Sequence, residues 1–124
     1  FEKWSEYQLS KTPEYRIENP TEINIFLDGR MTANDLQIFT VKSKQEIEAY
    51  KKTLFDDSEV EALPCSYKAT CHTGMMIGSL MSTVFLNHVS NKLSQIMFRE
   101  VPFATTFSNE LMDFKTYNYL EWKE

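Results

Sequence analysis

The chain has 124 residues, of which 42% are hydrophobic and 14% aromatic, which is enough apolar material for the core of one domain. Three glycines and four prolines exclude collagen-like repeats and argue against a disordered chain. The formal net charge is −5 and there is no basic stripe, so we expect no nucleic-acid partner.

The cysteine content and the lack of a signal peptide point to a reducing compartment. The chain has two cysteines and no Cys-x-x-Cys pair, so we expect a cytoplasmic protein without structural zinc. Its longest apolar stretch, Met75 to Leu86, is too short for a membrane span of roughly 20 residues. Because the chain begins with Phe1 and all six Met residues are internal, we expect a fragment, a processed product, or the readable part of a longer chain.

The first two predicted elements are a helix and a strand. Residues Phe1 to Lys11 have helical spacing, and Pro13 ends this helix. Residues Glu22 to Leu27 alternate between apolar and polar side chains, which predicts a strand. The sequence Asp-Gly-Arg-Met at positions 28–31 follows directly and begins with a turn signal.

The two charged residues of this turn are candidate substrate-binding residues. Asp28 and Arg30 come at the end of a hydrophobic strand, which is where α/β proteins place ligand groups. The alternative is a turn that carries a surface ion pair. The sequence alone leaves both interpretations open.

A second strand and a short helix follow. Residues Leu36 to Val41 predict a strand with Leu36 and Ile38 on one side and Phe39 and Val41 on the other. The short link before this strand favours an antiparallel neighbour. Ser43 and Glu46 have the spacing of a capping box at the start of a helix. The apolar face of this helix is made of Ile47, Tyr50 and Leu54.

The stretch from Cys65 to Val89 predicts the longest helix of the chain. It contains no acidic residue and one fixed positive charge, Lys68. Apolar side chains follow two neighbouring helical spacings, so they cover most of the circumference. The small residues Gly74, Gly78 and Ser82 are four apart and share one face, which would allow a close approach of another backbone. We therefore expect a central helix that other elements cover.

The last part of the chain predicts a hairpin. Residues Asn91 to Glu100 either extend the long helix or begin a strand near Gln95. Residues Phe103 to Phe107 and Leu111 to Tyr117 predict two strands, with a turn at residues 108–110.

Cys65 is the best candidate for catalysis. A thiol at a helix N-terminus has a lowered pKa, and Lys68 would lower it further. The resulting thiolate can attack an activated acyl group. The alternative is a small hydrophobic side chain packed at the helix start. Cys71 is most simply a buried thiol, and helical geometry points it away from Cys65, so we expect no disulfide.

The two histidines are weaker candidates for catalysis than Cys65. His72 follows Cys65 by seven positions, which in a helix separates them by about 10 Å along the axis, too far for a hydrogen bond. His88 is expected to interact with the dipole at the C-terminal end of the helix. No His, Asp or Glu cluster has metal-ligand spacing, so we expect no metal site.

Three features in this order resemble the second half of the ThiF/MoeB/HesA family, the ubiquitin-activating (E1-like) adenylyltransferases. They are the strand that runs into D-G-R-M, the strand L-Q-I-F-T-V, and P-C-S before a long helix rich in Gly and Met. The resemblance covers residues Phe1 to Val89. F-E-K-W at the start is similar to the helix that follows the family's Asp-x-x-x-x-Arg segment.

The resemblance implies an α/β fold: the second half of a Rossmann-like domain, with a mixed sheet and one long central helix, residues 1–124 forming a single partial domain. It also implies ATP-dependent adenylylation of the C-terminal carboxylate of a ubiquitin-like or sulfur-carrier (ThiS-like) protein, with release of pyrophosphate. Cys65 falls where several members carry an acyl-accepting cysteine, and Arg30 falls near the adenylate. Family members are usually homodimers.

The chain departs from the family in two respects. The G-x-G-x-x-G loop and the residues that bind nucleotide and magnesium would lie N-terminal to this sequence, and the paired Cys-x-x-Cys motifs are absent. ATP and magnesium are thus expected for the full-length protein, with neither bound by this segment alone. The segment should then expose a hydrophobic face where the first half belongs.

Two other functions remain open. One is a non-catalytic E1-like module for interaction or dimerisation. The other is an unrelated small α/β structural domain, which is favoured if Asp28, Arg30 and Cys65 prove to be scattered.

Overall fold

The computed structural model describes residues 1–11, 14, 18, 22–54, 71–94 and 97–122, and the following account concerns these residues. They form three helices and four strands. In chain order these are α1 (Glu2–Ser10), β1 (Phe26–Met31), β2 (Asp35–Val41), α3 (Lys44–Lys51), α4 (Cys71–Leu93), β3 (Ala104–Ser108) and β4 (Asp113–Tyr117).

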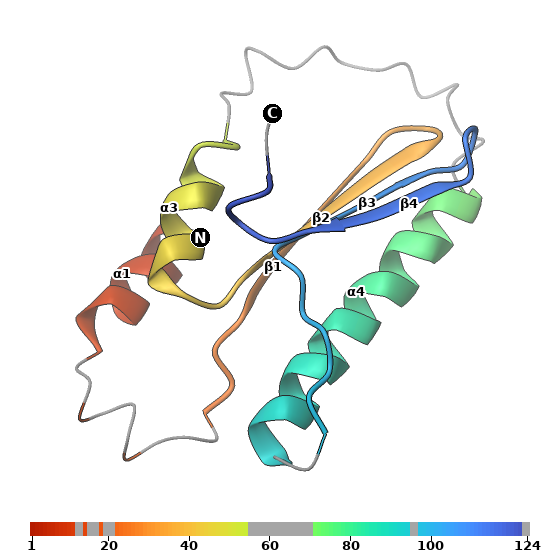
Figure 1. Ribbon diagram of the computed structural model, residues 1–124. Coiled ribbons are helices and arrows are strands. Elements are labelled where there is room, and N and C mark those ends of the chain that lie inside the picture. Colours follow the sequence, from red (N-terminus) through yellow and green to blue (C-terminus); the bar gives the residue numbers. More distant parts are fainter. Residues whose placement is uncertain (12–13, 15–17, 19–21, 55–70, 95–96, 123–124) are drawn as a thin grey trace.

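The strands form one sheet in the order β1-β2-β3-β4, between two helical layers. Helix α4 lies along one face, and α1 and α3 lie together on the other, near one end of the sheet (Figure 1). The predicted α/β class is therefore confirmed. The described sheet is antiparallel throughout, however, instead of mixed, because hairpins join its outer pairs and the whole α3-to-α4 region lies between β2 and β3.

Strand β2 separates the two layers. Leu36 and Ile38 point to α4, whereas Phe39 and Val41 point to α1 and α3. All four side chains are at most 1% exposed. This alternation is the one predicted for residues Leu36 to Val41, and the antiparallel pairing of β1 with β2 is also confirmed.

The layer of α1 and α3 closes over an aromatic cluster. Tyr50 of α3 lies edge-on to Phe1, with ring centroids 4.6 Å apart, and Phe39 lies perpendicular to Trp122 at 5.2 Å. Such edge-to-face pairs add to the area they bury. The buried members of this aromatic cluster are Phe39, Val41, Ile47, Tyr50, Phe103 and Ala104.

Helix α3 begins where the sequence predicts. The backbone N–H of Glu46 donates to the hydroxyl of Ser43 at 3.2 Å, and that hydroxyl donates to the Glu46 carboxylate at 3.0 Å. The Ser43 hydroxyl thus accepts a hydrogen bond from one of the backbone N–H groups that the first turn of the helix leaves unpaired. Its apolar residues Ile47 and Tyr50 are buried, while Leu54 lies beyond the helix and is exposed.

Helix α4 packs on the opposite face of the sheet. Its side chains Met76, Ile77, Leu80 and Met81 contact a second cluster, made of Leu36, Ile38 and Phe107. Its first turn is held by Thr73, whose hydroxyl donates to the carbonyl of Ala33 at 2.9 Å and accepts from Asn109 at 2.6 Å. Both turns at that end of the sheet are thereby joined to the helix.

The prediction of a covered central helix is wrong for the described part of the chain. One side of α4 faces the sheet, and the other side exposes Met75, Phe85, Leu86 and Leu93. The sheet, with β2 in its middle, is the centre of the fold. Within the described part of the chain, no neighbouring element places an atom within 4 Å of the point where a Cβ of Gly78 would lie, so no described backbone packs on the small-residue stripe there.

The close approach occurs instead at Gly29. A methyl group at this position would lie 2.7 Å from Sδ of Met81 and 3.0 Å from Cδ1 of Ile77. A side chain at position 29 would therefore force Met81 or Ile77 to shift, so glycine favours the close contact of β1 with α4. This contact also explains why residues 28–31 continue the strand, whereas the sequence predicts a strand at Glu22 to Leu27 followed by a turn.

The C-terminal hairpin is confirmed with a shifted boundary. β4 begins at Asp113, two residues later than predicted, because the turn extends to Met112, which has a positive φ of 52°. The ambiguous region after Asn91 continues α4 as far as Leu93. Among the described helices, α4 included, none is long and apolar enough to cross a membrane.

Two glycine substitutions test the packing of α4. Gly29→Ala should lower the free energy of unfolding by about 1–3 kcal/mol, because its methyl group overpacks the contact with Met81 and Ile77. Gly78→Ala should raise it by up to about 1 kcal/mol, because that position is open and alanine favours the helix. Chemical denaturation measures both, and equal effects at the two positions would contradict the packing of β1 on α4.

Candidate functional site

The two candidate residues of the D-G-R-M sequence lie on the same side of β1. Asp28 and Arg30 flank Gly29, so both point to the face that carries α3. The Nε of Arg30 donates to Oδ2 of Asp28 at 2.8 Å. Both side chains are about one quarter exposed, so the ion pair is half-buried.

The guanidinium of Arg30 is also held by the end of α3. Its Nη1 donates to the carbonyl of Thr53 at 3.0 Å, and its Nη2 donates to the Thr53 hydroxyl at 3.1 Å. Its Cζ lies 4.7 Å from the centre of the Phe39 ring, which is a cation–π contact. Three nitrogens of the guanidinium thus donate hydrogen bonds to acceptors within the protein.

Tyr50 completes this arrangement. Its hydroxyl donates to Oδ2 of Asp28 at 2.7 Å, the same oxygen that accepts from Arg30. Burial of the phenol raises the pKa of Tyr50 to about 12, and the hydrogen bond to Asp28 acts in the same direction. We call Asp28, Arg30, Tyr50 and Thr53 the polar clamp, because these side chains tie the end of α3 to β1.

The structure thus brings together two of the three predicted site residues. Asp28 and Arg30 form the ion pair of the alternative interpretation, but within a strand and bonded to α3 instead of in a surface turn. Cys65 and Lys68 lie outside the described residues. The predicted role of Cys65 stays a prediction.

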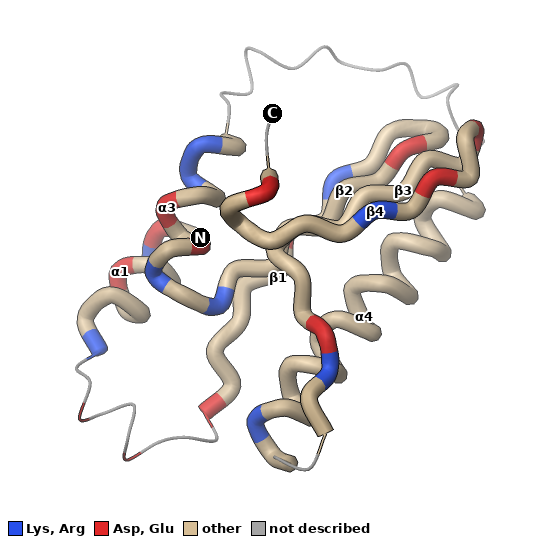
Figure 2. Tube along the Cα trace, viewed as in Figure 1, with Lys and Arg blue, Asp and Glu red and all other residues tan. Residues whose placement is uncertain are grey.

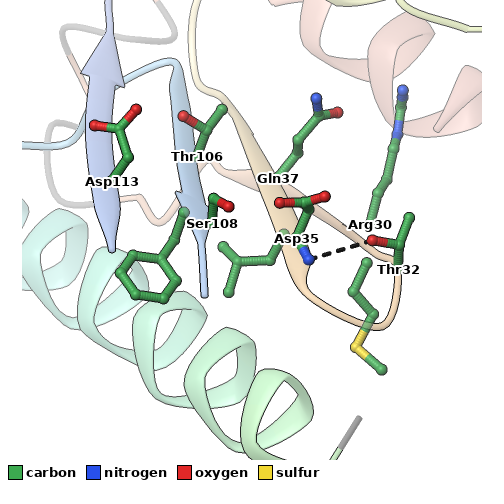
Figure 3. A pocket seen from close by; sticks show the side chains of 10 residues that line it. Arg30, Thr32, Asp35, Gln37, Thr106, Ser108 and Asp113 are labelled. Carbon is green, nitrogen blue, oxygen red and sulfur yellow. Dashed lines mark hydrogen bonds between the residues drawn. The ribbon is translucent and has the colours of Figure 1, made fainter. Parts of the chain in front are cut away.

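Beside the clamp, the sheet carries an open hollow of about 680 Å³ on the face that α1 and α3 leave uncovered. Arg30 belongs to the polar clamp and also lines this hollow. Polar side chains from all four strands line it (Figure 3). Leu36 and Phe107 also line it, and they belong to the cluster that packs against α4. The polar residues are Arg30, Thr32, Asp35, Gln37, Thr106, Ser108 and Asp113.

Strand register sets the positions of these groups. Gln37 is opposite Arg30 on one side and Thr106 on the other, and Ser108 lies between Asp35 and Asp113. The hollow can therefore offer carboxylate, hydroxyl and amide groups to a ligand. The sequence analysis missed it, because residues on β1 and β2 meet those on β3 and β4 only through long-range pairing.

The other thiol and the two histidines lie on α4. Cys71 is exposed and not the buried thiol that was predicted, because it begins α4 on the outer side, with its Sγ 3.9 Å from Sδ of Met75. His72 is exposed, and His88 is buried near the C-terminal end of the helix. Within the described residues, no group of three or more His, Cys, Asp or Glu side chains could hold a metal ion.

Comparisons of the chain with protein-family models, with curated proteins and with solved structures found no match.

The free energy of unfolding at alkaline pH tests the polar clamp. The pKa of Tyr50 is raised from 10 to about 12, so its contribution is complete below pH 10 and is lost as the pH rises toward 12. We expect Tyr50→Phe to be less stable than the wild type at pH 9, because Asp28 loses a buried donor. The difference should shrink between pH 10 and 12, as measured by urea denaturation.

The control is Tyr7→Phe, which removes an exposed hydroxyl from α1. Its free energy of unfolding should depend on pH in the same way as that of the wild type. If Tyr50→Phe and the wild type lose stability in parallel up to pH 12, the phenol is not held by Asp28 as described.

Proposed function

We propose that this chain is the C-terminal half of an E1-like adenylyltransferase of the ThiF/MoeB/HesA type. The complete protein would use ATP to adenylylate the C-terminal carboxylate of a ubiquitin-like or sulfur-carrier protein. The observation that carries the proposal is the position of the D-G-R-M strand. It lies at one edge of the described sheet and bears the Asp28–Arg30 pair.

The free edge of β1 supports this proposal. Among the described strands, β1 pairs with β2 alone, which leaves a row of backbone groups on its other side. Exposed edges are usually covered or extended by another strand. A nucleotide-binding half could complete a Rossmann-like sheet here.

The outer side of α4 offers a further surface for that half or for a partner protein. Met75 and Leu86 are 72% and 58% exposed, and Leu93 is 69% exposed. From Cys71 to Asn91 the helix has no Asp, Glu, Lys or Arg, and most of α4 is accordingly tan in Figure 2. An uncharged, partly apolar helix surface of this length supports the proposal, because exposed apolar patches of this kind often mark interaction sites.

The described residues do not fit ATP. No glycine-rich loop is present in the sequence, and the guanidinium of Arg30 donates to Asp28 and Thr53. We therefore propose that ATP and magnesium belong to the other half. In this proposal, Asp28 and Arg30 shape the strand edge near the partner's C-terminal tail, and Cys65 is the candidate acyl acceptor.

ATP–pyrophosphate exchange by the longer chain, with its ubiquitin-like partner present, tests the proposal. We expect exchange in the wild type and in Cys65→Ala, because adenylylation does not use the thiol. The thioester with the partner should form in the wild type and be absent from Cys65→Ala, as seen by non-reducing electrophoresis.

The matched control is Cys71→Ala, which removes the other thiol and should retain the thioester. A thioester that survives in Cys65→Ala would exclude Cys65. Loss of the thioester in Cys71→Ala alone would transfer its role to Cys71.

The second candidate function is a non-catalytic interaction or dimerisation module, and the outer side of α4 favours it. If α4 forms the contact between two copies, Leu86→Asp should convert a dimer to a monomer, because it places a charge in an apolar interface. Sedimentation equilibrium measures this.

Lys44→Asp, on the exposed side of α3, is the control and should leave the assembly unchanged. A Leu86→Asp protein that stays dimeric would remove α4 from the interface. If the longer chain shows no ATP–pyrophosphate exchange and Leu86→Asp disrupts its dimer, the non-catalytic dimerisation module is favoured over the adenylyltransferase.

A further inference from the structure

His88 is buried near the C-terminal end of α4, with only 4% of its surface exposed. Its Nε2 accepts a long hydrogen bond of 3.4 Å from the backbone N–H of Asn24, in the segment that leads into β1. The bond therefore joins α4 to a part of the chain that is 64 residues away in sequence.

The same segment is tied to the end of α1. The Nζ of Lys11 donates to Oδ1 of Asn24 at 3.1 Å and forms an ion pair with Glu22 at 2.8 Å. The side chain of Lys11 is only 3% exposed, so this contact is well shielded from water. A continuous set of polar contacts thus runs from α4 through Asn24 to α1.

The bond from Asn24 requires a neutral imidazole. A neutral ring has one nitrogen with a free lone pair, whereas both nitrogens of a protonated ring carry hydrogen and cannot accept. Protonation of His88 would place an N–H at Nε2, where it would face the Asn24 N–H. The contact would become repulsive.

Among the described residues, the charged groups that shift the pKa of His88 are both lysines, which oppose a positive ring. Lys92 on α4 and Lys42 after β2 both lower the pKa of His88, although burial lowers it most. The acidic groups on the surrounding elements that pair with a lysine are Glu46, which binds Lys42, and Glu22, which binds Lys11. The carbonyl of Glu100 is held by Asn87 of α4, and its side chain is exposed.

We propose that His88 is an acid-sensitive latch. Its protonation breaks the contact with Asn24 and releases residues 22–25, and with them the tie to α1, while the sheet stays folded. We expect the sheet to stay folded, because β2 is buried between two apolar clusters, one on each of its faces.

The direction of the pH effect follows from the pKa. In the open state, His88 has its ordinary pKa near 6.5, and in the closed state its pKa is lower. The latch is therefore fully closed above pH 6.5 and opens as the pH falls below it. With a single proton involved, the opening constant rises at most tenfold per pH unit.

The chain has two histidines, which gives a matched pair of variants. We would follow backbone amide resonances of ¹⁵N-labelled protein from pH 7.5 to pH 5 in the wild type, His88→Gln and His72→Gln. The Asn24 amide and the last turn of α1 should move in the wild type below pH 6.5, while the β2 amides stay in place. His72→Gln should behave as the wild type, and His88→Gln should lose the pH-dependent shift.

Two outcomes would overturn the latch: an unchanged transition in His88→Gln, or β2 amides that move together with Asn24. If His88→Gln does not fold, the side-chain nitrogens of His88 can be titrated in the wild-type protein. Their midpoint should coincide with that of the Asn24 amide, and protonation of His88 without any change at Asn24 would refute the proposal.

Discussion

The burial of β2 on both faces is the constraint on which the rest of the structure depends. Side chains that alternate along this strand enter two separate clusters, one beneath α4 and one beneath α1 and α3. Because both faces are apolar at Ile38 and Phe39, a shift of register by one residue would exchange the partners of every side chain. Strand β2 thereby fixes the register of β1 and β3 and positions both helical layers.

The polar clamp marks the border between the covered and the open half of one sheet face. On one side of Arg30 the aromatic cluster lies under α3, and on the other side the hollow is lined by polar groups. A half-buried ion pair such as this needs further hydrogen bonds to offset the loss of hydration, and Tyr50 and Thr53 supply them.

Local pattern was sufficient for much of the fold. The alternation of Leu36 to Val41 predicted β2 and its two faces, and the spacing of Ser43 and Glu46 predicted the start of α3. Both signals act within one element. The pairing of β1 with β2 also followed from sequence, since a short link permits only an antiparallel neighbour.

The remainder depended on contacts between distant segments. Gly29 resembled a turn residue until its contact with Met81 and Ile77 was known. The apolar residues of α4 suggested a covered helix, although the sequence does not tell how many neighbours are present to cover it. For the candidate site, Asp28 and Arg30 were predicted, but Tyr50 and Thr53 were missed, because their spacing in sequence gives no sign of a shared contact.

Native-state hydrogen exchange of the backbone amides tests most directly whether β2 is the centre of the fold. The amides of β2 that pair with β1 and β3 should exchange slowest, at the rate of global unfolding, and those on the outer side of α4 should exchange faster. Slower exchange in α4 than in β2 would contradict this account and would restore the long helix as the core of the domain.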